Sequence, residues 1–155
     1  MLVAEHLNFV YPAPGPNFPQ TEALRDITFH LETGEALAVM GASGSGKSTL
    51  CHVLAGLAPR YTGGHVSGVA RVAGYDVLAT MPPTGAVGLL FQDAATQLFN
   101  PTVADEVAWG LEALGTPPQH IGALVEEALA CFGLQDVQTR SPWALSGGQQ
   151  KRLAL

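Results

Sequence analysis

Residues 41–49 read Gly41-Ala42-Ser43-Gly44-Ser45-Gly46-Lys47-Ser48-Thr49, and this run decides the fold. It fits the pattern G-x-x-x-x-G-K-[ST], in which a glycine-rich turn wraps backbone N–H groups around phosphate oxygens. The glycines leave room for the phosphates because no Cβ intrudes on the turn. Lys47 adds a positive charge that can reach the β- and γ-phosphates, and the Ser48 hydroxyl can ligate Mg²⁺. The whole run is therefore predicted to bind nucleotide.

The segments on either side have the character that such a loop requires. Residues 35–40 are mostly apolar, which predicts a strand leading into the loop, and residues 48–57 predict a helix leaving it. The N-terminus of that helix would direct its positive dipole end at the phosphates. Strand, glycine loop and helix in this order form the unit of P-loop NTPases, so the sequence predicts an α/β fold of that type.

Two further motifs lie downstream. Leu145-Ser146-Gly147-Gly148-Gln149 places a serine hydroxyl and glycine amides at the start of a helix, a pattern typical of an anion site. Leu89-Leu90-Phe91-Gln92 is an apolar run that ends in glutamine. By itself the first motif could be a helix-capping turn. The second, with Asp93, loosely imitates the aspartate-ended strand of a P-loop kinase, but the polar Gln92 and the downstream motif argue against that alternative.

With Lys47, Gln92 and Ser146 in this order, the chain resembles the ATP-binding cassette (ABC) ATPases. The resemblance implies that residues 145–149 are the signature motif, which closes on the γ-phosphate held by a second ATPase domain. It implies that Gln92 is the Q-loop glutamine, which contacts Mg²⁺ and the attacking water. The implied cofactors are ATP and Mg²⁺, with Ser48 and Gln92 as metal contacts. The implied catalytic residues are Lys47 and Gln92.

Tyr11 is a weaker candidate for nucleotide binding. It ends the first apolar stretch, and in ABC ATPases an aromatic residue near this point, in the A-loop, stacks on the adenine ring. The alternative is a core or turn tyrosine that precedes Pro12. Residues 12–20 are too rich in proline for a helix or a central strand, which predicts an exposed loop.

The resemblance covers residues 1–155 as one partial ABC ATPase domain and divides them into three parts. Residues 1–100 are expected to form the nucleotide-binding core, with the phosphate loop and the Q-loop. Residues 101–145 are expected to form the helical subdomain. Residues 145–155 hold the signature motif and the start of its helix.

The core is expected to carry an antiparallel β layer beside the nucleotide. Residues 2–10, 24–31 and 68–74 have the apolar pattern of its strands. Residues 87–92 are expected to form a strand that returns to the core sheet.

Two amphipathic helices are predicted between residues 101 and 140. Thr102 can cap the first, with Asp105 three residues on. Its apolar residues recur at helical spacing, at Val103, Val107, Leu111 and Leu114. The second follows Pro117-Pro118, and Gly133 suits its C-terminal end.

The sequence around the Q-loop resembles one subgroup of the family. Residues 91–103 and 105–110 are similar to the ATPase subunits of energy-coupling-factor importers, which bring vitamins and metal ions into prokaryotic cells. This implies a transmembrane partner subunit whose coupling helix lies near Gln97, Leu98 and Phe99. An exposed Leu98–Phe99 pair would suit docking, and the alternative is that both residues pack beneath the helical subdomain.

The composition indicates how the chain associates with a membrane and which other partners are disfavoured. The chain is 47% hydrophobic but has no run near the roughly 18–20 apolar residues that span a bilayer. Membrane association is therefore expected to be peripheral, at the cytoplasmic face and through the partner subunit. A net charge of −6 disfavours nucleic acid as a partner. Cys51 and Cys131 stand alone, which predicts free thiols.

The sequence reaches Leu155 inside the helix that follows the signature motif. In ABC ATPases a later strand ends in an Asp-Glu pair that supports Mg²⁺ and activates water. Glu126, Glu127 and Asp136 lie on or beside an amphipathic helix and do not fit that pair. The core sheet is therefore expected to be incomplete because the C-terminal part is missing. The chain alone is expected to hydrolyse ATP negligibly and to be poorly stable.

Three functional classes remain open at this point. The first is the ATPase subunit of an ABC importer, which the Q-loop region favours. The second is a soluble ABC ATPase with a mechanical role in repair or translation. The third is a non-catalytic nucleotide-binding remnant, which would apply if the chain ends at Leu155.

Overall fold

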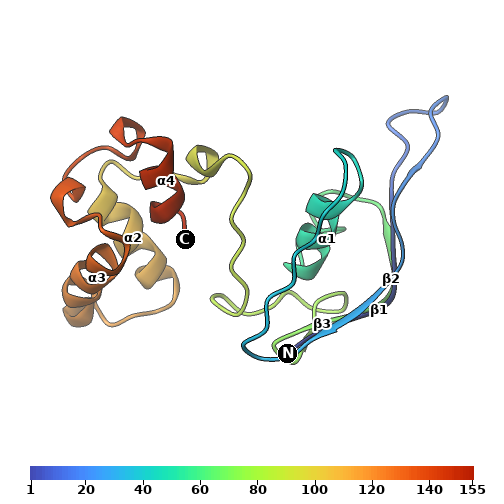
Figure 1. The fold of residues 1–155 in the computed structure, drawn as a ribbon, viewed down its shortest axis with the longest axis horizontal. Coiled ribbons are helices and arrows are strands. Elements are labelled where there is room, and N and C mark those ends of the chain that lie inside the picture. The colour runs from blue at the N-terminus through green and yellow to red at the C-terminus, as the bar shows by residue number, and fades with distance from the viewer. The chain divides into compact units, whose positions relative to one another are not determined.

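The computed structural model describes residues 1–155, which divide into two compact units, Met1–Val87 and Gly88–Leu155. The first unit contains a sheet and helix α1, and the second is helical (Figure 1). Each unit has its own cluster of buried apolar residues. The predicted functional division at residues 100 and 145 stays a prediction.

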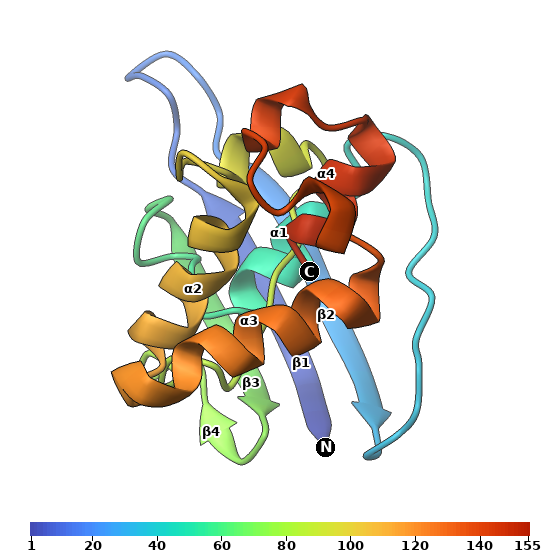
Figure 2. The same cartoon turned by 90° about the vertical axis from the view of Figure 1, so that its left-hand side faces the viewer.

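The first unit is built on an antiparallel sheet with the strand order β2-β1-β3-β4 (Figure 2). Its strands are β1 (Leu2–Tyr11), β2 (Thr21–Leu31), β3 (His65–Val72) and β4 (Tyr75–Asp76). Ala4, Leu7 and Phe9 of the central strand β1 are fully buried, because an apolar face of β1 is turned to the core. The three predicted strands of the antiparallel layer are confirmed, although β3 begins and ends earlier than expected.

A bulge in β1 explains why its alternation shifts by one residue. Glu5 and His6 are both exposed between the buried Ala4 and Leu7, and the pairing register with β3 shifts at this place. Gly68 of β3 lies against the bulge, where a Cβ would overlap the carbonyl oxygen of His6. Its φ of 100° is also one that side-chain-bearing residues rarely adopt. A glycine is therefore required here for two independent reasons.

Helix α1 (Lys47–Leu54) lies on one face of this sheet (Figures 1 and 2). Leu50 and Val53 of the helix join the core that the strands form. The helix was predicted over residues 48–57, and it is shorter. Residues 12–20 connect β1 to β2 as a largely exposed loop, as their prolines predicted.

The second unit packs three helices and three short 3₁₀ turns around one core. These are η1 (Ala94–Gln97), α2 (Val103–Ala113), α3 (Pro118–Phe132), η2 (Gln135–Val137), η3 (Pro142–Ala144) and α4 (Gly147–Leu153). Thr102 caps α2, because its Oγ1 accepts a hydrogen bond from the Asp105 N–H at 3.1 Å. Gly133 ends α3 in the left-handed conformation, with a φ of 63°. Both predicted helix ends are confirmed.

Two predicted strands do not form. Residues 35–40 and 87–92 take part in no sheet, and Met40 is 87% exposed. A strand exists only where a neighbour accepts and donates its backbone hydrogen bonds, and no segment of this chain pairs with either one. The apolar pattern predicted a strand in each range, and both predictions are wrong for these residues because the pairing is absent. The antiparallel layer is the one sheet that these residues form, so the expected core sheet has no strand here.

The side chain of Gln97 makes two hydrogen bonds to the backbone of residues 89–91, which a neighbouring strand would otherwise make. The Phe91 N–H donates to Gln97 Oε1 at 2.8 Å, and Gln97 Nε2 donates to the Leu89 carbonyl oxygen at 3.0 Å. One amide thus takes both hydrogen bonds that a paired residue would take in a sheet. The segment just before Gln92 is tied to η1 in this way.

Replacing Gln97 with alanine is expected to release this segment. Each net hydrogen bond contributes about 1 kcal/mol and the variant removes two of them, so protection of the Phe91 amide against hydrogen exchange should fall about 30-fold. Exchange followed by mass spectrometry or NMR measures this. Gln119→Ala, at an exposed position on α3, is the matched control and should leave the Phe91 amide unchanged. Equal protection in Gln97→Ala and the unmodified chain would contradict the assignment.

Candidate nucleotide-binding site

The glycine-rich run forms a tight loop that ends at the first turn of α1. Ser45 N–H donates to the Ala42 carbonyl oxygen at 3.3 Å, which closes the turn inside the loop. Residues 41–45 are exposed, so their backbone amides are accessible to a ligand. No acidic residue lies in the first turn of α1, and therefore no carboxylate competes with a phosphate there.

Gly46 places the loop against the sheet. It is the N-cap residue of α1 with a φ of 91°, and a Cβ at this position would overlap the carbonyl oxygen of Ala23 in β2. Only a residue without a side chain lets the two backbones approach so closely. The third glycine of the motif thus positions the helix N-terminus, in addition to leaving space for a ligand.

Lys47 lies over the loop with its ammonium group pointing back to it. Its Nζ donates to the carbonyl oxygens of Gly41 (2.9 Å) and Ala42 (2.7 Å), and contacts Ser45 Oγ at 3.2 Å. The charge is therefore held beside the exposed loop amides, where an anion would meet both. Ser48 follows on α1 with an exposed side chain, so its hydroxyl is available as an oxygen ligand. These donor groups fit a nucleotide triphosphate and Mg²⁺.

Tyr11 also belongs to this unit and lies beside α1. Its hydroxyl is 3.1 Å from Oγ1 of Thr49, the last residue of the run 41–49. Its side chain is half-buried and packs against the core of the first unit. The structure thus brings Tyr11 and residues 41–49 together.

Gln92 and the signature motif belong to the second unit, whereas Lys47 belongs to the first. The side chain of Gln92 is exposed. Its neighbour Asp93 caps η1, accepting a hydrogen bond from the Ala95 N–H at 3.2 Å. The backbone is therefore fixed on both sides of Gln92, by Gln97 before it and by η1 after it.

In the predicted signature motif, some residues are buried or cap α4, and the others are exposed to a partner. Leu145 is 7% exposed and belongs to the core of the second unit. Ser146 and Gln149 form a capping box at the start of α4, in which the Ser146 N–H donates to Gln149 Oε1 at 3.0 Å. Gly147 and Gly148 are exposed, and a Cβ at either would meet no atom within 4 Å. Ser146 and these glycines are the groups that a partner could reach.

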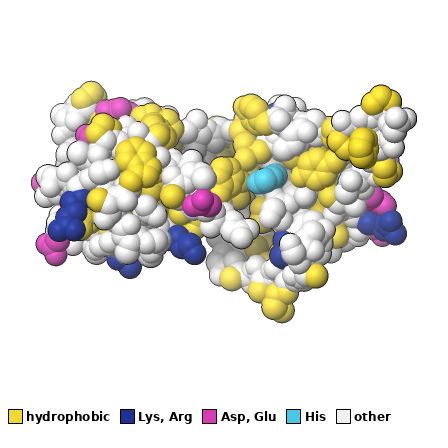
Figure 3. Space-filling view, turned by 90° about the horizontal axis from the view of Figure 1, so that it is seen from above, with side chains coloured by type: hydrophobic (Ala, Val, Ile, Leu, Met, Phe, Trp, Pro, Cys, Tyr) yellow, Lys and Arg dark blue, Asp and Glu magenta, His cyan; other side chains and the backbone are white.

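Leu98 and Phe99 were considered either as an exposed docking surface or as residues packed in the core, and the structure places one in each role. Leu98 is 5% exposed and packs in the core, while Phe99 is 54% exposed. Glu106 of α2 fixes this turn, because its Oε2 accepts hydrogen bonds from the N–H groups of Phe99 (3.0 Å) and Asn100 (2.8 Å). Hydrophobic side chains are visible on the surfaces of both units (Figure 3).

Trp109 is a surface residue that the sequence interpretation did not select. It is 49% exposed and lies edge-on to Phe99, with the ring centroids 4.8 Å apart. Residues three apart on a helix lie on the same face, so Trp109 lies on the face of α2 that carries Glu106. That spacing is the sequence feature that could have placed Trp109 near Phe99. Phe99 and Trp109 together are called the aromatic pair below.

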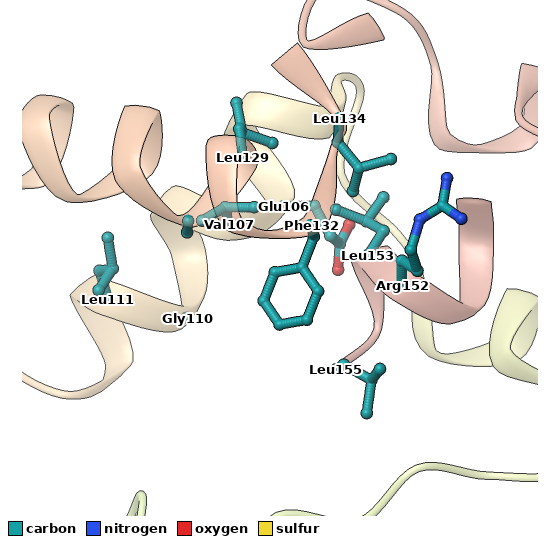
Figure 4. A pocket seen from close by; sticks show the side chains of 11 residues that line it. Glu106, Val107, Gly110, Leu111, Leu129, Phe132, Leu134, Arg152, Leu153 and Leu155 are labelled. Carbon is teal, nitrogen blue, oxygen red and sulfur yellow. The ribbon is translucent and has the colours of Figure 1, made fainter. Parts of the chain in front are cut away.

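A cavity of about 270 Å³ in the second unit holds no catalytic group. Figure 4 shows Leu129, Phe132 and Leu153 among the mainly apolar side chains that line it. Glu106 reaches its wall, but that carboxylate already binds two backbone amides. The lining is therefore mainly apolar, with Arg152 as its one cationic side chain.

No helix of the structure is both long and apolar enough to cross a bilayer. No group of three or more His, Cys, Asp or Glu side chains is arranged to hold a metal ion.

Comparison with known proteins finds relatives that are named for ATP binding. An ABC transporter ATP-binding protein of Geobacter sulfurreducens is 43% identical to this chain over 138 residues. The match covers 87% of this chain and 53% of the relative. The energy-coupling factor transporter ATP-binding protein EcfA1 of Lacticaseibacillus paracasei is 40% identical over 154 residues, 97% of this chain and 51% of the relative. The chain thus spans about half the length of these relatives.

A solved structure shares the fold. That of cbiO1 from Clostridium perfringens, described as part of the ABC transporter complex cbiONQ, matches with a TM-score of 0.75 and 29% identity. The match covers 99% of this chain and 58% of cbiO1. The profile of the family described as ABC transporter matches residues 24–155, a range that includes the phosphate loop and the segments predicted to be the Q-loop and the signature motif. The chain belongs to the ABC transporter family.

Proposed function

We propose that this protein is the ATP-binding and ATP-hydrolysing subunit of an ABC transporter. The observation that carries the proposal is the phosphate loop, in which Gly46 seats the loop on β2 and Lys47 holds its charge beside exposed amides. Bound ATP would supply the γ-phosphoryl group that is transferred to water. Lys47 would offset its negative charge, and the Ser48 hydroxyl would contribute to the Mg²⁺ site.

The remaining predicted residues take the family's roles in this proposal. Gln92 would contact Mg²⁺ and orient the attacking water, since its exposed side chain follows a backbone that Gln97 ties down. Ser146, Gly147 and Gly148 would meet the γ-phosphate held by the loop of a second ATPase domain. Their exposure at the N-terminus of α4 supports that role. The protein would then act as a dimer that closes on ATP and reopens after hydrolysis.

The transporter is proposed to be an importer of the energy-coupling-factor type, carrying a vitamin or a metal ion. The 40% identity to EcfA1 across 97% of this chain supports the subgroup, as does the likeness to cbiO1. The aromatic pair supplies an exposed apolar surface on the helical unit, which suits the docking of a transmembrane subunit. The protein would accordingly lie at the cytoplasmic face of the membrane, attached through that subunit.

Two alternatives differ from this proposal, one in its partner and the other in whether it hydrolyses ATP. A soluble ABC ATPase with a mechanical role would bind ATP but no membrane subunit. A nucleotide-binding remnant would bind ATP without hydrolysing it, even with its partners. ATP hydrolysis in the presence of the partners, and the identity of the co-purifying protein, distinguish these cases.

Lys47→Ala is expected to weaken the binding of MgATP about 10- to 100-fold. A hydrogen bond to a charged group contributes about 1.5–3 kcal/mol, and the variant removes both the donor and its charge. Titration calorimetry measures the affinity. Lys151→Ala removes an exposed lysine from α4 and serves as the control, for which unchanged affinity is expected. Unaltered MgATP binding by Lys47→Ala would refute the proposed site.

The protein is also expected to co-purify with a transmembrane subunit from cells of its source. Phe99→Ser and Trp109→Ser should each reduce the recovered subunit at least about tenfold, because aromatic anchors often contribute 2 kcal/mol or more to an interface. Quantitative mass spectrometry of the purified complex measures the loss. Phe18→Ser, at a residue 63% exposed in the loop after β1, is the control. Recovery of soluble partners alone would favour the mechanical ABC ATPase.

A further inference from the structure

Thr49 is the only buried polar residue of the chain, with 7% of its surface exposed. It is the third residue of α1 and directly follows Ser48, the last position of the phosphate-loop pattern. A buried hydroxyl needs a hydrogen-bond partner, since leaving one without a partner is costly. Oγ1 of Thr49 has such a partner in the Tyr11 hydroxyl, at 3.1 Å. The phosphate loop is thus linked to the end of β1 by two side-chain hydroxyls.

The ring of Tyr11 is held in place by the core. It packs against the buried cluster of the first unit, with its ring edge-on to Phe9 at a centroid distance of 4.8 Å and an interplanar angle of 76°. Phe9 is fully buried, so it gives the tyrosine ring a fixed neighbour. The hydroxyl is therefore presented to Thr49 by a ring with little freedom to move.

Two contacts fix the N-terminus of α1 on the sheet. Gly46 lies against the Ala23 carbonyl of β2, and Thr49 bonds to Tyr11 of β1. Tyr11 and Thr21 are paired across the two strands, so both contacts lie at the same end of the β1–β2 ladder. Lys47 and Ser48 lie between the two anchors along the chain. A shift at either anchor would displace the groups that are proposed to bind phosphate.

We propose that the hydroxyl of Tyr11 positions the phosphate loop for the triphosphate, acting through its hydrogen bond to Thr49. This inference rests on the proposed function, because it assumes that the loop binds nucleotide. A stacking residue would act only on ligands with a base. A residue that positions α1 acts on every ligand the loop holds, with or without a base.

The test compares MgATP with magnesium tripolyphosphate, which has the phosphates and no base. Tyr11→Phe keeps the aromatic ring and removes only the hydroxyl. It should weaken both ligands to the same extent, about three- to tenfold, because one buried hydrogen bond is lost. In a Thr49→Val background the same substitution should change either affinity less than twofold, since its partner hydroxyl is already gone. Thr49→Ser keeps the hydroxyl and is the conservative control, expected to bind both ligands nearly as the unmodified chain does.

Each outcome decides the matter. Equal affinities of Tyr11→Phe and the unmodified chain for both ligands would overturn the proposal, and so would a loss confined to MgATP. A loss of similar size in the Thr49→Val background would also overturn it, because Tyr11 would then act through some other contact. Should Tyr11→Phe fail to fold, Thr49→Val must by itself weaken both ligands while Thr49→Ser does not, or the proposal fails. If the unmodified chain binds neither ligand, the proposed function fails instead.

Discussion

The close approach of two backbones at Gly46 is the constraint on which the proposed site depends. Helix α1 begins where the chain passes the Ala23 carbonyl oxygen without a side chain between them. This contact sets the start of the helix, and hence where Lys47 and Ser48 lie. Hydrophobic packing of Leu50 and Val53 then holds the helix on the sheet, and that packing is less directional than a backbone contact. The affinity for phosphate would follow from this geometry, because loop amides and the lysine charge act only where they converge.

Side chains replace missing backbone pairing in the second unit. Gln97 ties down residues 89–91, and Glu106 ties down the turn at Phe99 and Asn100. Both act on segments without a strand or helix of their own, where each backbone group needs another partner. The proposed Q-loop glutamine and the aromatic pair are thus held by polar side chains from the same short stretch of chain. A transmembrane partner that contacted the aromatic pair would act next to this network.

Much of the local structure followed from residue types alone. Thr102 with Asp105 predicted the start of α2, Gly133 predicted the end of α3, and the prolines of residues 12–20 predicted the exposed loop. These features depend on neighbours within a few residues, so the sequence carries them directly. The phosphate loop was equally clear, because its chemistry demands particular residues in a particular order.

Features that depend on distant partners could not be predicted in this way. Residues 35–40 and 87–92 have the apolar pattern of buried strands, yet pairing decides whether a strand exists, and no pairing segment is present. The hydroxyl of Tyr11 meets Thr49 across 38 positions of sequence, and no spacing rule reveals such a contact. The division of the signature motif into a buried leucine, a capping glutamine and exposed glycines likewise depends on the packing around α4.

The most direct test of the central claim compares Gly46→Ala with Gly44→Ala. Both glycines have positive φ values, 91° and 81°, so alanine introduces similar backbone strain at each. Only at position 46 would the new Cβ overlap the Ala23 carbonyl oxygen, whereas at position 44 it meets no atom within 4 Å. In urea unfolding, Gly46→Ala should lower the free energy of unfolding by about 1–3 kcal/mol more than Gly44→Ala does. Equal losses for the two variants would show that the loop is not seated on β2 in this way.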